Sequence, residues 1–138
     1  MADFLPPSKT HSRALRFLEL RRLLKSFGYA LRGLKTAWLS EQNFRIELTL
    51  GLIALGLSLW LGANSSVIAL VVALVLVLEL VNSALERTID LASPHYHQLA
   101  KEAKDITAAA VLIASILSIF IGIYELVPAL WQKLQAFF

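Results

Sequence analysis

The 138-residue sequence has no cysteine, and only 17% of its residues are charged. The absence of cysteine excludes a disulfide framework, a thiolate metal site and a thiol nucleophile. The phosphate-binding patterns Gly-x-x-x-x-Gly-Lys-Ser/Thr and Gly-x-Gly-x-x-Gly are also missing, and no serine, histidine and aspartate order suits acyl transfer. A soluble phosphate-binding loop and an acyl-transfer triad are therefore absent.

Apolar residues, in contrast, make up 57% of the sequence, and its mean hydropathy is +0.66. Both values lie outside the range of ordinary soluble proteins. The length allows one domain and no more. The composition therefore predicts an all-α integral membrane protein.

Three apolar stretches predict membrane-spanning helices. They lie at about 46–62, 67–90 and 106–127. The first is at the short end of what a hydrocarbon core about 30 Å thick requires. The uncharged turn residues 62–66 predict a tight hairpin loop. We expect a polar connection at 91–105, broken by Pro94, and an end to the third span at Pro128 and the aromatic tail that follows.

A further helix, at about 9–40, is predicted to be an amphipathic surface helix, interrupted or bent near Gly28 and Gly33. Its apolar side chains recur at steps of three and four residues, while most basic side chains project elsewhere. The apolar residues are Leu20, Leu23, Leu24, Phe27, Leu31, Leu34 and Trp38. Such a helix lies in the lipid interface or packs on another helix, and the two are compatible.

The basic residues are distributed unevenly: nine of the 13 Lys and Arg lie in residues 1–45, and the 62–66 loop has none. The positive-inside rule places the N-terminus and the 87–104 connection in the cytoplasm. We expect the basic end to lie at an anionic membrane surface, and not on nucleic acid, because the neighbouring apolar residues are arranged for lipid.

One polar stripe interrupts the end of the second span. Glu79, Asn82, Glu86 and Asp90 fall within a face roughly 80° wide on a helix. An acidic side chain near the middle of a span costs about 2.5–3.5 kcal/mol on translocon-type scales. A cation, a proton, a partner helix or a charged substrate must offset that cost, and a structural polar seam between helices is the simplest alternative.

Carboxylate and amide oxygens of this kind suit Mg²⁺, which is usually shared between one or two carboxylates and phosphate oxygens. Glu79, the deepest acid, is the candidate general base for a hydroxyl. Glu79, Glu86 and Asp90 also suit a proton relay in a small proton-coupled transporter. His95 and His97 form a weaker metal candidate, because a catalytic zinc site needs a third ligand.

The polar residues form an ordered, discontinuous motif that resembles the prokaryotic diacylglycerol kinase and undecaprenol kinase family over residues 22–127. Its main part is Glu79-x-x-Asn82-x-x-x-Glu86-x-x-x-Asp90, then Ala103-Lys104-Asp105 and Ala109-Ala110-Val111-Leu112; upstream it includes Gly28-Tyr29-Ala30-x-x-Gly33, Trp38, Glu41 and Asn43-Phe44-Arg45. Residues 1–20 form an extension without counterpart in the shortest members, which leaves one lipid kinase domain at 21–138.

The resemblance implies ATP-dependent, Mg²⁺-assisted phosphorylation of a lipid hydroxyl at the cytoplasmic membrane face of a prokaryote, by a homotrimer with shared active sites. The acceptor is undecaprenol or diacylglycerol. The segments 43–46 and 93–101 look more like the undecaprenol kinase branch, which slightly favours that acceptor.

The resemblance also implies roles for individual residues. The general base is Glu79, and the metal-associated carboxylates are Glu41 and Glu86. The nucleotide-side residues are Asn82, Glu86, Asp90, Lys104, Asp105, Arg22 and Tyr29. The lipid-side residues are Glu79, Glu47 and Trp38.

Overall fold

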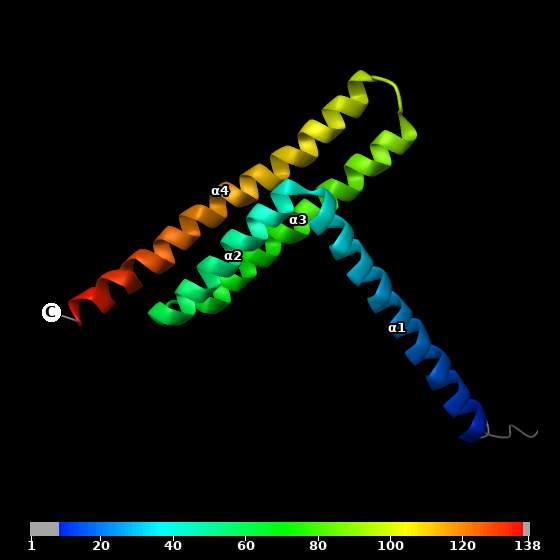
Figure 1. Ribbon diagram of the computed structural model, residues 1–138, viewed down its shortest axis with the longest axis horizontal. Coiled ribbons are helices and arrows are strands. Elements are labelled where there is room, and N and C mark those ends of the chain that lie inside the picture. The colour runs from blue at the N-terminus through cyan, green and yellow to red at the C-terminus, as the bar shows by residue number, and fades with distance from the viewer. Residues whose placement is uncertain (1–8, 137–138) are drawn as a thin grey trace, which may run out of the picture. The chain divides into compact units, whose positions relative to one another are not determined.

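The computed structural model describes residues 9–136, which form four helices and no strand (Figure 1). They are α1 (Lys9–Ser40), α2 (Gln42–Leu61), α3 (Ser65–Ala92) and α4 (Gln98–Gln135). Residues 1–8, the first part of the predicted extension, lie outside the described part of the chain. The chain divides into two compact units, residues 1–36 and 37–138.

The N-terminal unit consists of α1 up to Thr36. The helix runs through Gly28 and Gly33 without a break, so the interruption considered from the sequence does not occur. Its described apolar side chains are largely exposed, for example Phe27 at 70%. The guanidinium of Arg32 lies 4.7 Å from the centre of the Tyr29 ring, a favourable cation–π distance.

The second unit contains α2, α3 and α4, and each of the three is long and apolar enough to cross a membrane, which confirms the three predicted spans. α3 packs against both α2 and α4. Gly51 permits a close approach of α2 to α3, because a Cβ atom at this position would lie 2.5 Å from Val72 Cγ1. Few apolar side chains are buried in this unit, chiefly Phe44, Ile68, Val75 and Val111.

The third spanning helix, α4, is longer than predicted at both ends. It begins at Gln98, where the side chain of His97 accepts a hydrogen bond from the backbone N–H of Leu99. Side-chain pairs four residues apart, such as Lys101 with Asp105, support its polar first turns. The prediction that Pro128 ends the helix is wrong, since Pro128 lies inside α4. Proline is tolerated in membrane helices because neighbouring groups satisfy the freed carbonyl.

The extended end of α4 contacts the end of α2. Lys133 Nζ donates a hydrogen bond to the carbonyl oxygen of Trp60, and it lies 4.2 Å from the centre of the Trp60 ring. A cation at the last carbonyls of a helix is favourable, because the partial negative charge of the helix dipole lies there. This contact joins the two helices at the end opposite Glu47 and Glu79.

Candidate active site

The polar stripe of α3 grades from buried to exposed. Glu79 is 3% exposed and Asn82 is 8% exposed, whereas the Asp90 side chain is 65% exposed. Glu86 is intermediate. A helix turn separates successive members, so the stripe faces the helix interface at its deep end and solvent at its shallow end.

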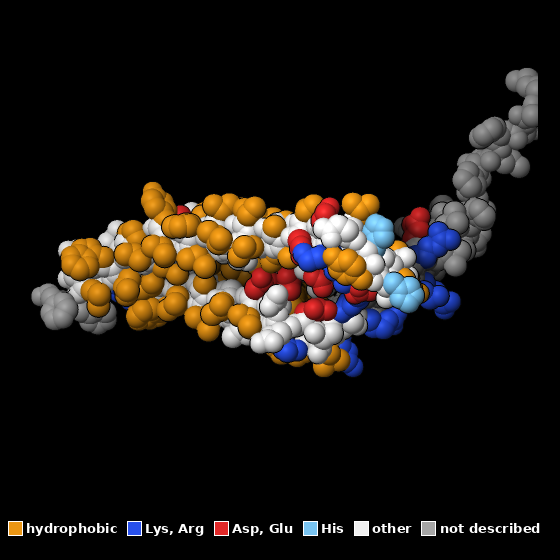
Figure 2. Space-filling model, turned by 90° about the horizontal axis from the view of Figure 1, so that it is seen from above, with side chains coloured by type: hydrophobic (Ala, Val, Ile, Leu, Met, Phe, Trp, Pro, Cys, Tyr) orange, Lys and Arg blue, Asp and Glu red, His pale blue; other side chains and the backbone are white. Residues whose placement is uncertain are grey.

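Four carboxylates lie near one another at this interface, and we call them the acid cluster: Glu41, Glu47, Glu79 and Glu86. Glu41 lies between α1 and α2, Glu47 lies in the second turn of α2, and the others lie on α3. The charge of Glu79 interacts with those of the other three. Figure 2 shows acidic side chains gathered toward one end of the apolar bundle. Like charges so close at membrane depth are costly, and a cation or a proton offsets that cost.

Asn82 supplies an amide to the same place. Its Nδ2 donates to Glu86 Oε1 at 3.0 Å, and because an ionised carboxylate only accepts, this contact fixes the orientation of the amide. The Asn82 Oδ1 atom is then buried without a hydrogen-bond partner, as is Glu47 Oε2. Buried acceptors without a donor are costly, so these oxygens are suited to receive a ligand.

The donors at this interface are all oxygen atoms, the set that Mg²⁺ prefers. Within residues 9–136, no three acidic or histidine side chains are close enough to hold a metal ion on their own. A Mg²⁺ ion held by one or two carboxylates together with substrate phosphates needs no such group of three. The predicted pair His95 and His97 lies in the exposed α3–α4 connection.

Two ion pairs border the acid cluster. In the first, Arg87 Nη2 lies 2.5 Å from Glu41 Oε1. In the second, Lys104 Nζ of α4 lies 2.5 Å from Asp90 Oδ1 of α3, and this pair joins the two helices at the shallow end of the stripe. Asp105 takes no part in these two pairs. Its exposed carboxylate pairs with Lys101 on its own helix.

Sequence reasoning missed Arg87. On a helix it projects about 100° away from Glu86, and therefore off the polar stripe. Its partner lies 46 residues earlier in the chain, and no local pattern indicates that contact. The only signal was its place directly after Glu86.

The remaining predicted residues are not gathered with the stripe by any described contact. Arg22 and Tyr29 belong to the N-terminal unit and are exposed there. The Trp38 side chain is 46% exposed, and its backbone carbonyl accepts a hydrogen bond from Arg45 at 2.9 Å. Their binding roles stay predictions.

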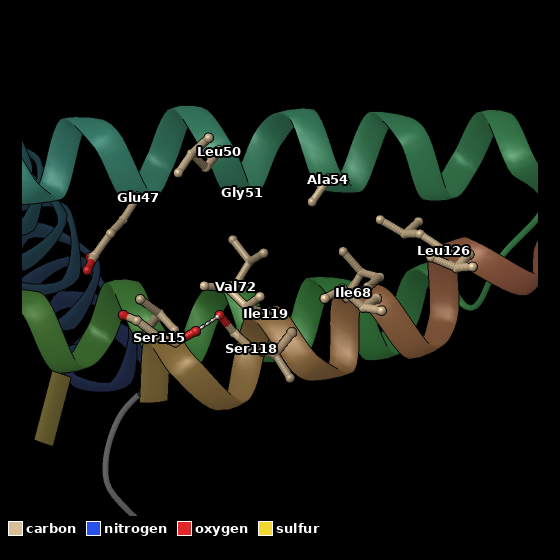
Figure 3. A pocket seen from close by; sticks show the side chains of 15 residues that line it. Glu47, Leu50, Gly51, Ala54, Ile68, Val72, Ser115, Ser118, Ile119 and Leu126 are labelled. Atoms are coloured by element: carbon tan, nitrogen blue, oxygen red, sulfur yellow. Dashed lines mark hydrogen bonds between the residues drawn. The ribbon is translucent and has the colours of Figure 1, made fainter. Parts of the chain in front are cut away.

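An apolar cavity of about 430 Å³ lies between α2, α3 and α4. Its polar lining residues are Glu47, Ser115 and Ser118, and its other lining residues are apolar or glycine. Figure 3 shows Glu47 at one end of the cavity and Leu126 toward the other. Because Glu47 also belongs to the acid cluster, the cavity connects that cluster to the hydrocarbon depth of the bundle.

Comparisons with known proteins point to one family. A family model described as prokaryotic diacylglycerol kinase matches residues 28–126. A diacylglycerol kinase of Escherichia coli K12 is 38% identical over 101 residues, which cover 71% of this chain and 83% of that protein. A diacylglycerol kinase of Synechocystis is 41% identical over 112 residues, which cover 78% of this chain and 64% of that protein.

An undecaprenol kinase of Bacillus subtilis 168 is 34% identical over 120 residues, which cover 81% of this chain and 94% of that protein. The matched region contains α2, α3, all four carboxylates of the acid cluster and most of α4. Bacterial relatives and three spanning helices make this a prokaryotic membrane protein. The chain belongs to the prokaryotic diacylglycerol kinase family, a family of lipid kinases.

Proposed function

We propose that this chain transfers the γ-phosphoryl group of ATP to the hydroxyl of a membrane lipid at the cytoplasmic face, with its N-terminus in the cytoplasm. The observation that carries the proposal is the acid cluster at one end of an apolar cavity, with Glu47 common to both. A lipid acceptor needs both parts of this site. Its hydroxyl must lie near the polar groups, and its hydrocarbon tail must lie in apolar surroundings. A proton relay needs no apolar cavity, and family membership favours the kinase over the transporter.

Glu79 is the proposed general base. As the hydroxyl oxygen of the lipid forms its bond to the γ-phosphorus, the bond from that phosphorus to the oxygen bridging to the β-phosphate breaks, and the hydroxyl proton passes to the Glu79 carboxylate. Its burial at 3% exposure keeps bulk water away from the transferring group. Most of the remaining catalysis is positioning and charge stabilisation.

The Mg²⁺ ion is assigned to Glu41 and Glu86, with the free Oδ1 of Asn82 as a third oxygen. When bound, Mg²⁺ neutralises charge on the β- and γ-phosphates. The protein's part is to hold the oxygens: the Asn82 amide orients Glu86, and Arg87 contacts Glu41.

The nucleotide is assigned to the shallow end, where Asp90 and Lys104 bring α3 and α4 together. The nucleotide-binding roles of Arg22, Tyr29 and Asp105 stay predictions. The lipid head lies by Glu79, Glu47 and Trp38, and its tail lies in the cavity. We also propose a homotrimer with shared active sites, because three spans form a thin bundle for keeping the polar stripe of α3 away from lipid.

Label transfer tests the proposal. The purified chain in detergent micelles receives γ-labelled ATP, Mg²⁺ and either undecaprenol or diacylglycerol. We expect label in the extracted lipid only when an acceptor is present, with undecaprenol the better acceptor. Solute flux across liposomes without ATP, and no labelled lipid with either acceptor, would contradict the kinase and support the transporter.

A further inference from the structure

Arg87 is the one cation that, among the described residues, forms an ion pair with the acid cluster. Its Nη2 donates to Glu41 Oε1 at 2.5 Å and to Ser40 Oγ at 2.6 Å. Ser40 Oγ in turn donates to the same Glu41 oxygen at 3.0 Å. These three side chains therefore contact one another and join α3 to the α1–α2 junction.

The carboxylate of Glu41 is oriented by α3 and not by its own helix. Glu41 is the N-cap residue of α2, with φ −103° and ψ 113°, yet its side chain accepts no capping hydrogen bond from α2. Asp, Asn, Ser and Thr are the side chains that normally accept such a bond from the first turn. The longer Glu41 side chain instead accepts from Arg87 on α3. Here both hydrogen bonds of the carboxylate fall on Oε1, which leaves Oε2 for a further ligand.

We infer that Arg87 is a positioning residue, which holds the Glu41 carboxylate in the acid cluster in the orientation that serves the metal nucleotide. The inference rests on the proposed function, in which Glu41 is metal-associated. The planar guanidinium suits this task, because its fork of donors fixes both the distance and the direction of an oxygen. An ion pair in which Arg87 is 48% exposed adds little stability by itself, so the orientation is what it contributes.

A simple charge effect predicts the opposite sign. Removal of a positive charge beside four carboxylates makes the site more attractive to a divalent cation. If Arg87 only competes with the metal, its removal tightens metal binding. If Arg87 positions Glu41, its removal weakens metal binding, because partners that orient a ligand typically account for about 10–100-fold in metal affinity.

The experiment measures Mn²⁺ binding by electron paramagnetic resonance, with Mn²⁺ in place of Mg²⁺ and the non-hydrolysable nucleotide AMP-PNP. The full chain in detergent is compared with Arg87→Gln, Arg87→Lys, Glu41→Gln and the double variant. We expect Arg87→Gln to weaken Mn²⁺ binding about tenfold or more, and Arg87→Lys to restore part of it. The double variant should match Glu41→Gln alone, because Arg87 acts through Glu41.

Lys133→Gln is the matched control. It also removes a cation and a side-chain contact, to the Trp60 carbonyl, at the opposite end of the bundle, and it should leave Mn²⁺ affinity unchanged. Tighter or unchanged binding by Arg87→Gln, or a double variant weaker than Glu41→Gln, would overturn the inference.

Label transfer by the unmodified chain separates this inference from the proposed function. If the unmodified chain labels lipid but Arg87→Gln does not weaken Mn²⁺ binding through Glu41, the positioning role alone is refuted. If Arg87→Gln weakens Mn²⁺ binding and the double variant matches Glu41→Gln, but the unmodified chain transfers no label to lipid, the lipid kinase proposal is refuted and the positioning role is kept. A chain that binds no Mn²⁺ with AMP-PNP refutes both.

Discussion

A leucine at Gly122 tests whether the cavity holds the tail of the lipid acceptor. Gly122 lines the cavity, and a Cβ atom added there meets no other atom within 4 Å, so the larger side chain enters open space. Gly122 lies seven residues after Ser115, about 10 Å farther along α4 from the Glu47 end. Gly122→Leu should therefore obstruct a long tail and spare the acid cluster.

The expected loss is smaller than a transfer into water. A displaced tail returns to lipid, so the hydrophobic contribution of about 0.8 kcal/mol per methylene does not apply. What is lost is packing, about 0.1–0.2 kcal/mol for each pair of carbon atoms in contact. Loss of about ten such contacts costs about 1–2 kcal/mol, which lowers kcat/KM for the lipid about five- to thirtyfold.

The assay is label transfer at saturating ATP, with the concentration of a long-chain acceptor varied. Gly56→Leu is the control, because its Cβ atom also meets open space but Gly56 does not line the cavity. We expect Gly122→Leu to lower kcat/KM for the lipid and to leave the KM for ATP unchanged. A short-chain acceptor that does not reach Gly122 should be unaffected. Equal effects of the two leucine variants, or none at Gly122, would refute the placement of the tail.

Two further substitutions test the metal assignment and the helix packing. Glu86→Gln should raise the Mg²⁺ concentration for half-maximal turnover about tenfold or more, and an unchanged Mg²⁺ titration would argue against metal association. Gly51→Ala should destabilise the bundle, because overpacking costs about 1–3 kcal/mol and Val72 is stiff at χ1, whereas Gly56→Ala has no such contact. Thermal unfolding in detergent compares the two alanine variants, and equal stabilities would contradict the close approach at Gly51.

The sequence predicts the three spans because their signal is local. Apolar runs and their breaks report membrane helices directly, and helical periodicity brings Glu79 and Asn82 to one face. The extension of α4 was missed because polar first turns and an internal proline look like loop signals. The structure shows instead that side-chain pairs such as Lys101 with Asp105 stabilise those turns.

The cavity and the Arg87 contact could not be predicted from the sequence, for a different reason. Both depend on how closely helices approach one another, and this distance is set by single positions such as Gly51 against Val72. No periodic pattern relates Arg87 to Glu41, since the two residues meet only when α3 packs against the start of α2. The individual binding roles and the homotrimer stay predictions.

The central claim is that the buried carboxylate of Glu79 accepts the proton of the lipid hydroxyl. The most direct measurement is the rate of label transfer to lipid by Glu79→Gln, with Mn²⁺·AMP-PNP binding measured on the same preparation. The account predicts a loss of about 10²–10⁴-fold in rate with nucleotide binding retained, since a positioned base contributes about that much. Labelling of lipid by Glu79→Gln at close to the original rate would contradict it.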